Sequence, residues 1–153
     1  MTKAILVAVA AIVLCTPVKA SAPDVPLLLV APADIKWEST ARPDSVRGTL
    51  WGDPTKGAFA FFNRYEGGWQ LPLHYHTHQL SGVIISGTFV IHVASQEAKP
   101  LTTGSYFSLP GNTRHTDACL PGPPCVVYFA GDEPLDRVTA EESDGELPMR
   151  IGG

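Results

Sequence analysis

Three histidines at alternate positions, His74, His76 and His78, constrain this chain more than any other feature of its sequence. In an extended strand successive side chains point to opposite faces, so the three imidazoles would project from one side. Convergent neutral imidazoles bind borderline metals such as zinc, iron, nickel and copper. The apolar run that follows ends at Gly87 in a turn signature, which supports a strand here. The segment predicts a metal-binding strand, and a polar, solvent-facing strand edge is the alternative.

The first 22 residues have the pattern of a secretory signal peptide. Lys3 precedes an apolar run over 4–14, and the Ala20-Ser-Ala22 tripeptide fits the cleavage pattern of such peptides. The apolar run is too short to span a bilayer as a stable helix. We therefore expect a periplasmic or secreted protein that has no membrane attachment once the signal is cleaved.

Without that segment the chain is small and acidic. The full sequence has 11 basic and 15 acidic residues, and the loss of Lys3 and Lys19 leaves nine and 15, a net charge of −6. This balance argues against nucleic acid and against an anionic membrane surface as partners. About 130 residues remain, enough for one domain with a single core. We expect an N-terminal arm with a first strand over 23–45, one domain over 46–138 and a polar tail over 139–153.

Short apolar segments separated by turn residues predict an almost entirely β fold. Glycine and proline each occur 14 times, a frequency that is typical of a sandwich or barrel. A helical period is seen only at 135–142. His92 shares a face with the more polar residues of its segment, which indicates a surface or rim position. The expected strands are 35–38, 49–51, 58–65, 70–76, 82–86, 88–94, 105–109 and 125–130.

A second segment, from Gly104 to His115, contains a candidate third ligand. A turn at Gly104 leads into a short strand, and a proline-glycine turn ends this strand shortly before His115. A strand that folds back across a sandwich can bring His115 against His74 and His76. Two histidines from one strand and one from a distant strand make an open metal site.

These two segments resemble the two sequence motifs of the cupins, a family of small jelly rolls built from two sheets. Much of 35–136 is also similar to a group of bacterial cupins catalogued as a domain of unknown function. The resemblance implies an all-β, double-stranded β-helix or jelly-roll sandwich that holds one divalent metal. The residues that match are Gly68, His74, His76 and Gly87 in the first motif and Gly104, Pro110 and His115 in the second.

The chain departs from the first cupin motif at a ligand position. Where the family has a glutamate, this sequence has Leu80, which cannot bind a metal. Either the site consists of three histidines, or Gln79 or His78 supplies a further contact after a local bulge. Without a carboxylate the ion keeps its full charge among neutral ligands, which favours an anionic substrate. The alternative is a degenerate cupin that keeps the histidines and binds no metal.

Two cysteines outside the signal segment, Cys119 and Cys125, are six positions apart. In an exported protein this arrangement favours a disulfide. Closing so small a loop contributes roughly 2 kcal/mol when the stabilisation is attributed to chain entropy. Cys119 also stands where the second cupin motif has an asparagine, so a soft metal ligand is the competing interpretation. Disulfide formation would consume the thiolate that such a ligand needs.

Other residues near the histidine strands are candidates for the mouth of a pocket or for an interface. Aromatic residues on jelly-roll strands more often pack in a core or an interface. The apolar arm Leu27–Val30 is a candidate surface for a second subunit, and the cupin resemblance implies a homodimer formed by strand exchange. The pocket candidates are Arg64, Trp69 and Tyr106.

The sequence therefore predicts an exported cupin with one divalent ion, which is zinc, iron, manganese, nickel or copper, and a small molecule as substrate. Dioxygenase chemistry is the leading hypothesis, because three histidines leave positions for a bidentate substrate and for oxygen. Isomerase or hydrolase chemistry would follow from zinc. No catalytic residue is predicted beyond the histidines. The hypothesis of a different class is a periplasmic module that binds or senses a small ligand or metal without turnover.

Overall fold

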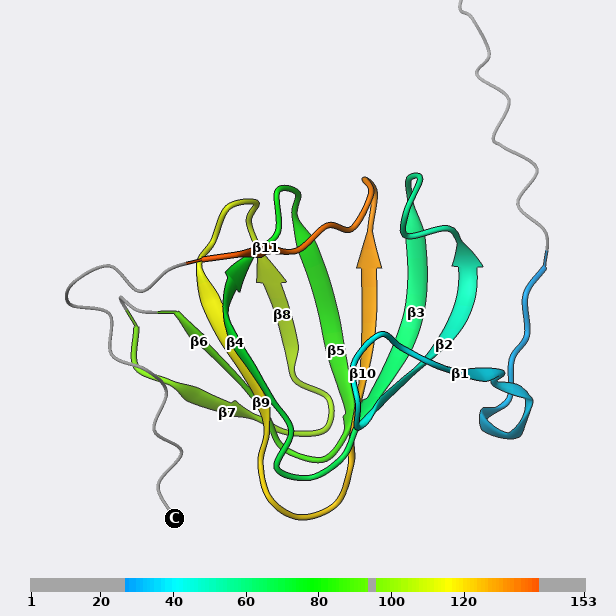
Figure 1. The fold of residues 1–153 in the computed structure, drawn as a ribbon. Coiled ribbons are helices and arrows are strands. Elements are labelled where there is room, and N and C mark those ends of the chain that lie inside the picture. Colours follow the sequence, from blue (N-terminus) through cyan, green and yellow to red (C-terminus); the bar gives the residue numbers. More distant parts are fainter. Residues whose placement is uncertain (1–26, 94–95, 141–153) are drawn as a thin grey trace, which may run out of the picture.

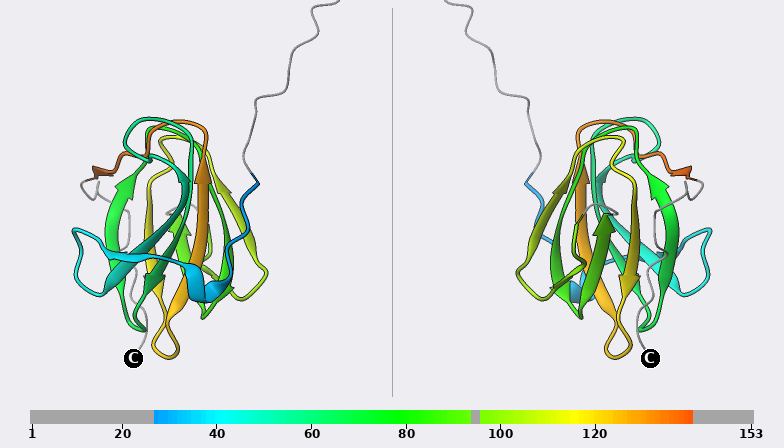
Figure 2. Two further views of the ribbon diagram at one scale, coloured as in Figure 1. Left: turned by 90° about the vertical axis from the view of Figure 1, so that its right-hand side faces the viewer. Right: turned by 90° about the vertical axis from the view of Figure 1, so that its left-hand side faces the viewer.

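The computed structural model describes residues 27–93 and 96–140, which form two antiparallel sheets (Figure 1). One sheet has six strands in the order β1-β2-β3-β10-β5-β8, and the other has five in the order β11-β4-β9-β6-β7. The sheets form the two layers of a sandwich, which Figure 2 shows from two sides. The prediction of an all-β jelly roll is confirmed.

Most strands are short and bounded by turns. Those of the six-stranded sheet are β1 (Trp37–Ser39), β2 (Ser45–Gly52), β3 (Phe59–Tyr65), β5 (Leu80–Ser86), β8 (Tyr106–Leu109) and β10 (Cys125–Gly131). Those of the five-stranded sheet are β4 (Gln70–Tyr75), β6 (Phe89–Val93), β7 (Lys99–Leu101), β9 (His115–Cys119) and β11 (Val138–Thr139). A single 3-10 turn, η1 (Pro32–Asp34), precedes β1. Within 27–93 and 96–140, no helix has the length and apolarity of a membrane span.

The structure differs from the predicted elements at one expected helix and at two strands. Residues 135–140, where the sequence has a helical period, contain the short strand β11 and no helix. Strands β7 and β9 were not predicted, because both lack a run of apolar residues. Strand β9 pairs with β4 on one side and β6 on the other, so neighbouring strands bury its polar residues. The predicted signal peptide and most of the predicted tail lie outside the described residues.

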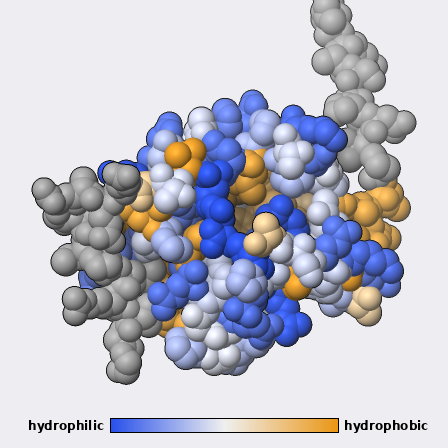
Figure 3. Space-filling view, in the orientation of Figure 1, coloured by the Kyte–Doolittle hydropathy of each residue, from blue (hydrophilic) through white to orange (hydrophobic). Residues whose placement is uncertain are grey.

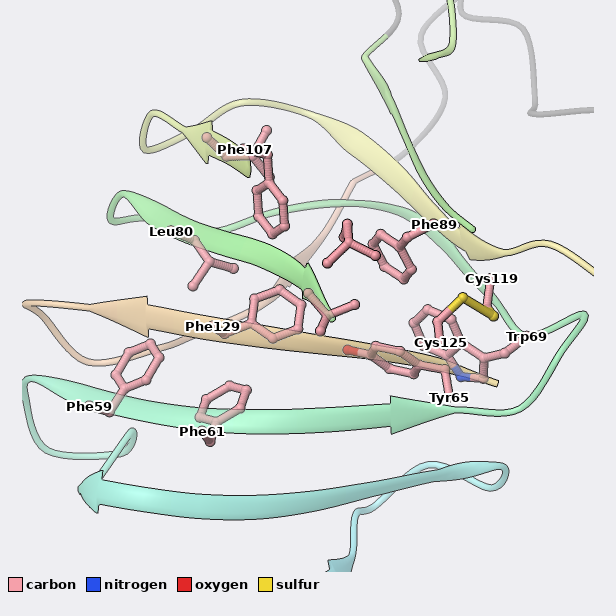
Figure 4. Close-up of a cluster of buried hydrophobic side chains, with 13 residues drawn as sticks. Phe59, Phe61, Tyr65, Trp69, Leu80, Phe89, Phe107, Cys119, Cys125 and Phe129 are labelled. Atoms are coloured by element: carbon pink, nitrogen blue, oxygen red, sulfur yellow. A yellow bond between two sulfur atoms is a disulfide. The ribbon is translucent and has the colours of Figure 1, made fainter. Parts of the chain in front are cut away.

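Aromatic side chains form most of the core between the sheets (Figure 4). Strand β3 points Phe59, Phe61 and Tyr65 inward at alternate positions, as the pleat of a strand requires. The ring of Tyr65 stacks on Trp69 with centroids 4.0 Å apart and on Phe89 with centroids 5.6 Å apart. These large side chains fill the sandwich beside the site described below.

A disulfide joins the two sheets. Cys119 ends β9 in one sheet, Cys125 begins β10 in the other, and their sulfur atoms are 2.11 Å apart. This is the pairing that the cysteine spacing predicted. Both cysteines are fully buried and belong to the aromatic cluster (Figure 4). The bond leaves neither thiolate free to bind a metal.

Replacing both Cys119 and Cys125 with alanine is expected to lower the free energy of unfolding by about 2 kcal/mol. The crosslink closes a short loop, and without it the unfolded chain gains conformational freedom. Urea unfolding followed by tryptophan fluorescence measures this difference. Wild-type protein treated with a reductant should unfold at the midpoint of the variant. A reduced wild type that is as stable as the oxidised protein would contradict the prediction.

Candidate metal centre

Three histidines meet on the inner side of the five-stranded sheet. His74 lies in β4, His76 directly follows β4, and His115 begins β9. His74 and His115 are paired across these two strands. One ligand nitrogen from each of the three lies within 4.8 Å of the others. The structure thus brings together the three residues that the sequence predicted as ligands, and the cluster is able to hold one metal ion.

Backbone carbonyls fix the orientation of the three rings. Nδ1 of His74 and Nδ1 of His115 each lie 2.8 Å from a carbonyl oxygen, and Nδ1 of His76 also contacts one. Because a carbonyl only accepts, each Nδ1 carries the proton and each Nε2 keeps a free lone pair. This is the arrangement by which proteins orient histidine ligands. The accepting oxygens belong to Pro72, Asp136 and Thr113.

Burial keeps the three imidazoles neutral. Burial, with a further contribution from the neighbouring His115, lowers the pKa of His74 to about 3. The pKa values of His76 and His115 are also lowered, in each case chiefly by burial. Metal ligation requires the neutral form, so the site needs little proton release at neutral pH. Nε2 of His74 is buried without a hydrogen-bond partner in the described structure, and a metal ion would satisfy it.

Asp117 is a fourth polar residue at this site, and it was not among the predicted site residues. It lies two positions after His115 in β9 and therefore faces the same side. Its Oδ2 is 3.7 Å from Nε2 of His74 and 3.9 Å from Nε2 of His115. Its Oδ1 is buried and has no partner among residues 27–93 and 96–140. The period-two spacing between His115 and Asp117 is the signal that would have identified it.

The donor set fits a divalent cation. Burial raises the pKa of Asp117 to about 7, and burial lowers the pKa of His74. A divalent ion held by the three histidines would favour the ionised carboxylate beside it and satisfy the buried Nε2 of His74. Imidazole nitrogens with a carboxylate are a common ligand combination for zinc and other transition metals.

Two residues that the sequence offered as a fourth contact lie elsewhere. Gln79 is exposed, and its amide donates to the Ser108 hydroxyl at 3.2 Å. His78 is exposed and does not belong to the histidine cluster. A register shift does occur in β4, but it lies before His74 and so does not bring Gln79 or His78 inward.

The predicted pocket residues divide between the cavity and the surface. Trp69 lines the cavity and packs in the core. Arg64 is exposed and forms an ion pair of 3.3 Å with Glu66. Tyr106 is 63% exposed, and its hydroxyl lies 3.3 Å from that of Ser81. Neither Arg64 nor Tyr106 lines the cavity that holds the histidines.

This cavity lies between the sheets and has a volume of about 480 Å³, which suits a small molecule. About half of its lining residues are aromatic or aliphatic, and the others are polar or charged. Hydrophilic residues cover much of the face shown in Figure 3, and hydrophobic residues are visible between them near its middle. The charged residues of the lining are Glu38, Arg42, Arg47, Asp117, Asp136 and Arg137.

The chain also matches a known protein family. A family profile described as "ChrR Cupin-like domain" matches residues 26–135. No curated protein matches the chain. Among solved structures, the polyketide cyclase RemF from Streptomyces resistomycificus superimposes with a TM-score of 0.65 at 15% sequence identity, over 79% of this chain and 90% of that chain.

Two other solved structures have the same fold. KdgF from Halomonas sp. superimposes with a TM-score of 0.56 at 20% identity, over 67% of this chain and 93% of its own. The anti-sigma ChrR of Rhodobacter sphaeroides, solved in complex with SigE, gives a TM-score of 0.54 at 20% identity, over 67% of this chain and 51% of ChrR. At such identities the likeness shows the fold alone.

Proposed function

Because this chain belongs to the ChrR cupin-like family, a branch of the cupins its motifs resemble, we propose that it is a metal-dependent enzyme for a small anionic molecule. One observation carries the proposal. One ligand nitrogen from each of His74, His76 and His115 lies within 4.8 Å of the others, in a cavity of about 480 Å³. The Nδ1 of each ring faces a backbone carbonyl, which leaves the Nε2 lone pairs for a metal. These three residues would hold one ion of zinc, iron, manganese, nickel or copper.

Dioxygenase chemistry is the leading subclass of this proposal. A bound ion would supply a Lewis acid or, if it is redox-active, a centre for oxygen chemistry. The three histidines line the cavity, so a substrate bound there would lie close to them. Arg42 and Arg47 supply positive charge that favours an anion.

Proton-transfer chemistry, as in an isomerase or hydrolase, is the subclass that Asp117 supports. Its carboxyl lies beside His74 and His115 and lines the same cavity. A carboxyl group in that place can accept a proton at Oδ2 and return it to a neighbouring atom of the same substrate. This route requires no oxygen, so it is distinguishable from the dioxygenase route.

A non-catalytic sensing function is the second candidate. It is favoured by the likeness to ChrR, which is described as an anti-sigma protein in complex with a sigma factor. The chain spans about half of that protein, 51% of its length. In such a role the cavity would bind a small ligand or metal without turnover.

We also propose an exported protein and a homodimer. The signal pattern in residues 1–22 carries the first proposal, and a disulfide between Cys119 and Cys125 is typical of an oxidising compartment. The arm supports the second, because Leu27 is 87% exposed and Leu29 is 82% exposed. Such apolar side chains would be buried against a second copy.

The metal content of protein purified without an affinity tag tests the enzymatic proposal. We expect one ion per chain. Protein loaded with ferrous iron should then consume oxygen with at least one member of a panel of small carboxylic acids. Turnover with zinc in the absence of oxygen would move the assignment to proton transfer. Tight metal binding without turnover would favour the sensing function, and failure to take up any metal would overturn the proposal.

A further inference from the structure

Two arginines of the cavity have N–H groups that nothing in the described structure accepts. Arg42 lies in the loop between β1 and β2, and its buried Nε has no hydrogen-bond partner within 27–93 and 96–140. Arg47 lies in β2, and its Nε donates to Oδ1 of Asn63 at 3.1 Å. Over the same residues no carboxylate forms an ion pair with either guanidinium. Arginine N–H groups that have no acceptor in the protein are able to donate hydrogen bonds to a bound ligand.

Arg47 is held in a fixed orientation. The amide nitrogen of Asn63 lies 2.8 Å from the Tyr65 hydroxyl and donates to it, which leaves the amide oxygen to accept from Arg47. The guanidinium carbon of Arg47 also lies 4.0 Å from the centre of the Phe61 ring. These contacts use Nε and one face of the guanidinium. They leave its terminal N–H groups available as a planar pair of donors.

Among residues 27–93 and 96–140, no acidic residue of the cavity forms an ion pair with these arginines, and the electrostatic interaction of Asp117 with Arg42 acts without such a contact. Asp136 is engaged by a threonine, which donates to it from both its backbone and its hydroxyl. Asp117 lies against the histidines, and Glu38 is exposed on β1. Burial lowers the pKa values of Arg42 and Arg47, and both guanidiniums remain charged at neutral pH. The positive charge of the pair is therefore available to an anion.

We propose that Arg42 and Arg47 together bind a carboxylate, so that the substrate is a small carboxylic acid with an apolar or aromatic body. A planar guanidinium matches a planar carboxylate through two parallel hydrogen bonds. Phe61, Tyr65 and Trp69 line the same cavity and suit an apolar body. The inference rests on the proposed function for the other end of the substrate, which would face the histidines.

Benzoate and its neutral analogue benzamide test the inference, with binding measured by calorimetry on metal-free and zinc-loaded protein. Benzoate is expected to bind at least about tenfold more tightly than benzamide, because charge-assisted hydrogen bonds form with the carboxylate alone. Arg42→Gln and Arg47→Gln should each weaken benzoate binding by about tenfold or more. Benzamide binding should change little. Arg64→Gln is the matched control, since Arg64 lies outside the cavity.

Two further measurements keep this test decisive. Arg47→Lys retains the charge and removes the planar donor pair, so it should also lose affinity for benzoate while circular dichroism shows an intact fold. Zinc stoichiometry should be unchanged in every arginine variant. The inference would be overturned if benzoate and benzamide bound equally well, or if benzoate bound neither the metal-free nor the zinc-loaded protein. It would also be overturned if neither arginine substitution changed the affinity for benzoate. Loss of zinc uptake by the wild type, with arginine-dependent benzoate binding kept, would overturn the proposed function alone.

Discussion

Replacing His115 with alanine is expected to lower the affinity for zinc by at least about 100-fold, since even residues that only support metal ligands commonly contribute 10- to 100-fold. His115 lies opposite His74 across β4 and β9, so its loss removes one of three converging nitrogens. Competition against a chromophoric chelator measures the dissociation constant. His78→Ala is the matched control, because His78 is exposed and lies outside the cluster.

The His115 variant needs a check on folding, because this side chain is only 1% exposed. His115→Gln keeps most of the side-chain volume and removes the imidazole, so it separates loss of a ligand from loss of packing. We expect both variants to show the circular dichroism spectrum of the wild type. A His115→Gln protein that folds and still retains zinc would contradict the three-histidine site.

Replacing Asp117 with asparagine is expected to stabilise the metal-free protein above pH 7 by up to about 4 kcal/mol. Burial raises the pKa of Asp117 from 3.8 to about 7. Above pH 7 the folded wild type must therefore hold a buried charge that the unfolded chain exposes to water. Asparagine has nearly the same shape and carries no charge. Urea unfolding of both metal-free proteins across a pH series measures the difference.

The sign of this effect depends on pH and on metal. Below about 3.8 the carboxyl is protonated in both the folded and the unfolded state, so the two proteins should differ little there. The advantage of the variant should grow as the pH rises from 3.8 to about 7 and then level off. Acid also removes the stability that neutral His74 provides, as the pH falls from 6.5 towards 3, but this loss is common to both proteins.

Zinc should reverse the order of stability, because a divalent ion favours an ionised carboxylate. The zinc-loaded wild type should then be the more stable protein. Asp132→Asn, which changes an exposed aspartate, should have no effect in either form. If Asp117→Asn left the metal-free stability unchanged at every pH, the buried carboxyl would carry no charge cost and the prediction would be wrong.

The parts of the site that the sequence predicted are those set by local spacing. His74 points inward because it sits on the buried face of β4, where alternation fixes direction. The same alternation failed for His78, since β4 ends at Tyr75 and the chain bends before it reaches that residue. A period-two pattern predicts a face only as far as the strand continues.

The parts that the sequence did not predict depend on distant segments. Asp117 lies in β9, whose mixed polar residues are buried only because β4 and β6 pair on both sides of it. Arg42 and Arg47 line the histidine cavity because β1, β2 and the loop between them form part of its wall, and no local pattern signals that contact. The helical period at 135–142 was outweighed by pairing of Val138 with Tyr75 in β4.

Because His74 pairs with His115 across two strands, metal binding requires that β4 and β9 pair in their native register. These residues lie on strands that are distant in the sequence, and the antiparallel register places them opposite each other. A slip of one residue would turn His115 to the outer face of the sheet and separate the ligands. A bound ion would therefore stabilise only those chains whose β4 and β9 strands pair in the correct register. Chains that fold correctly would retain it, and misaligned chains would collect in the metal-free fraction of a preparation.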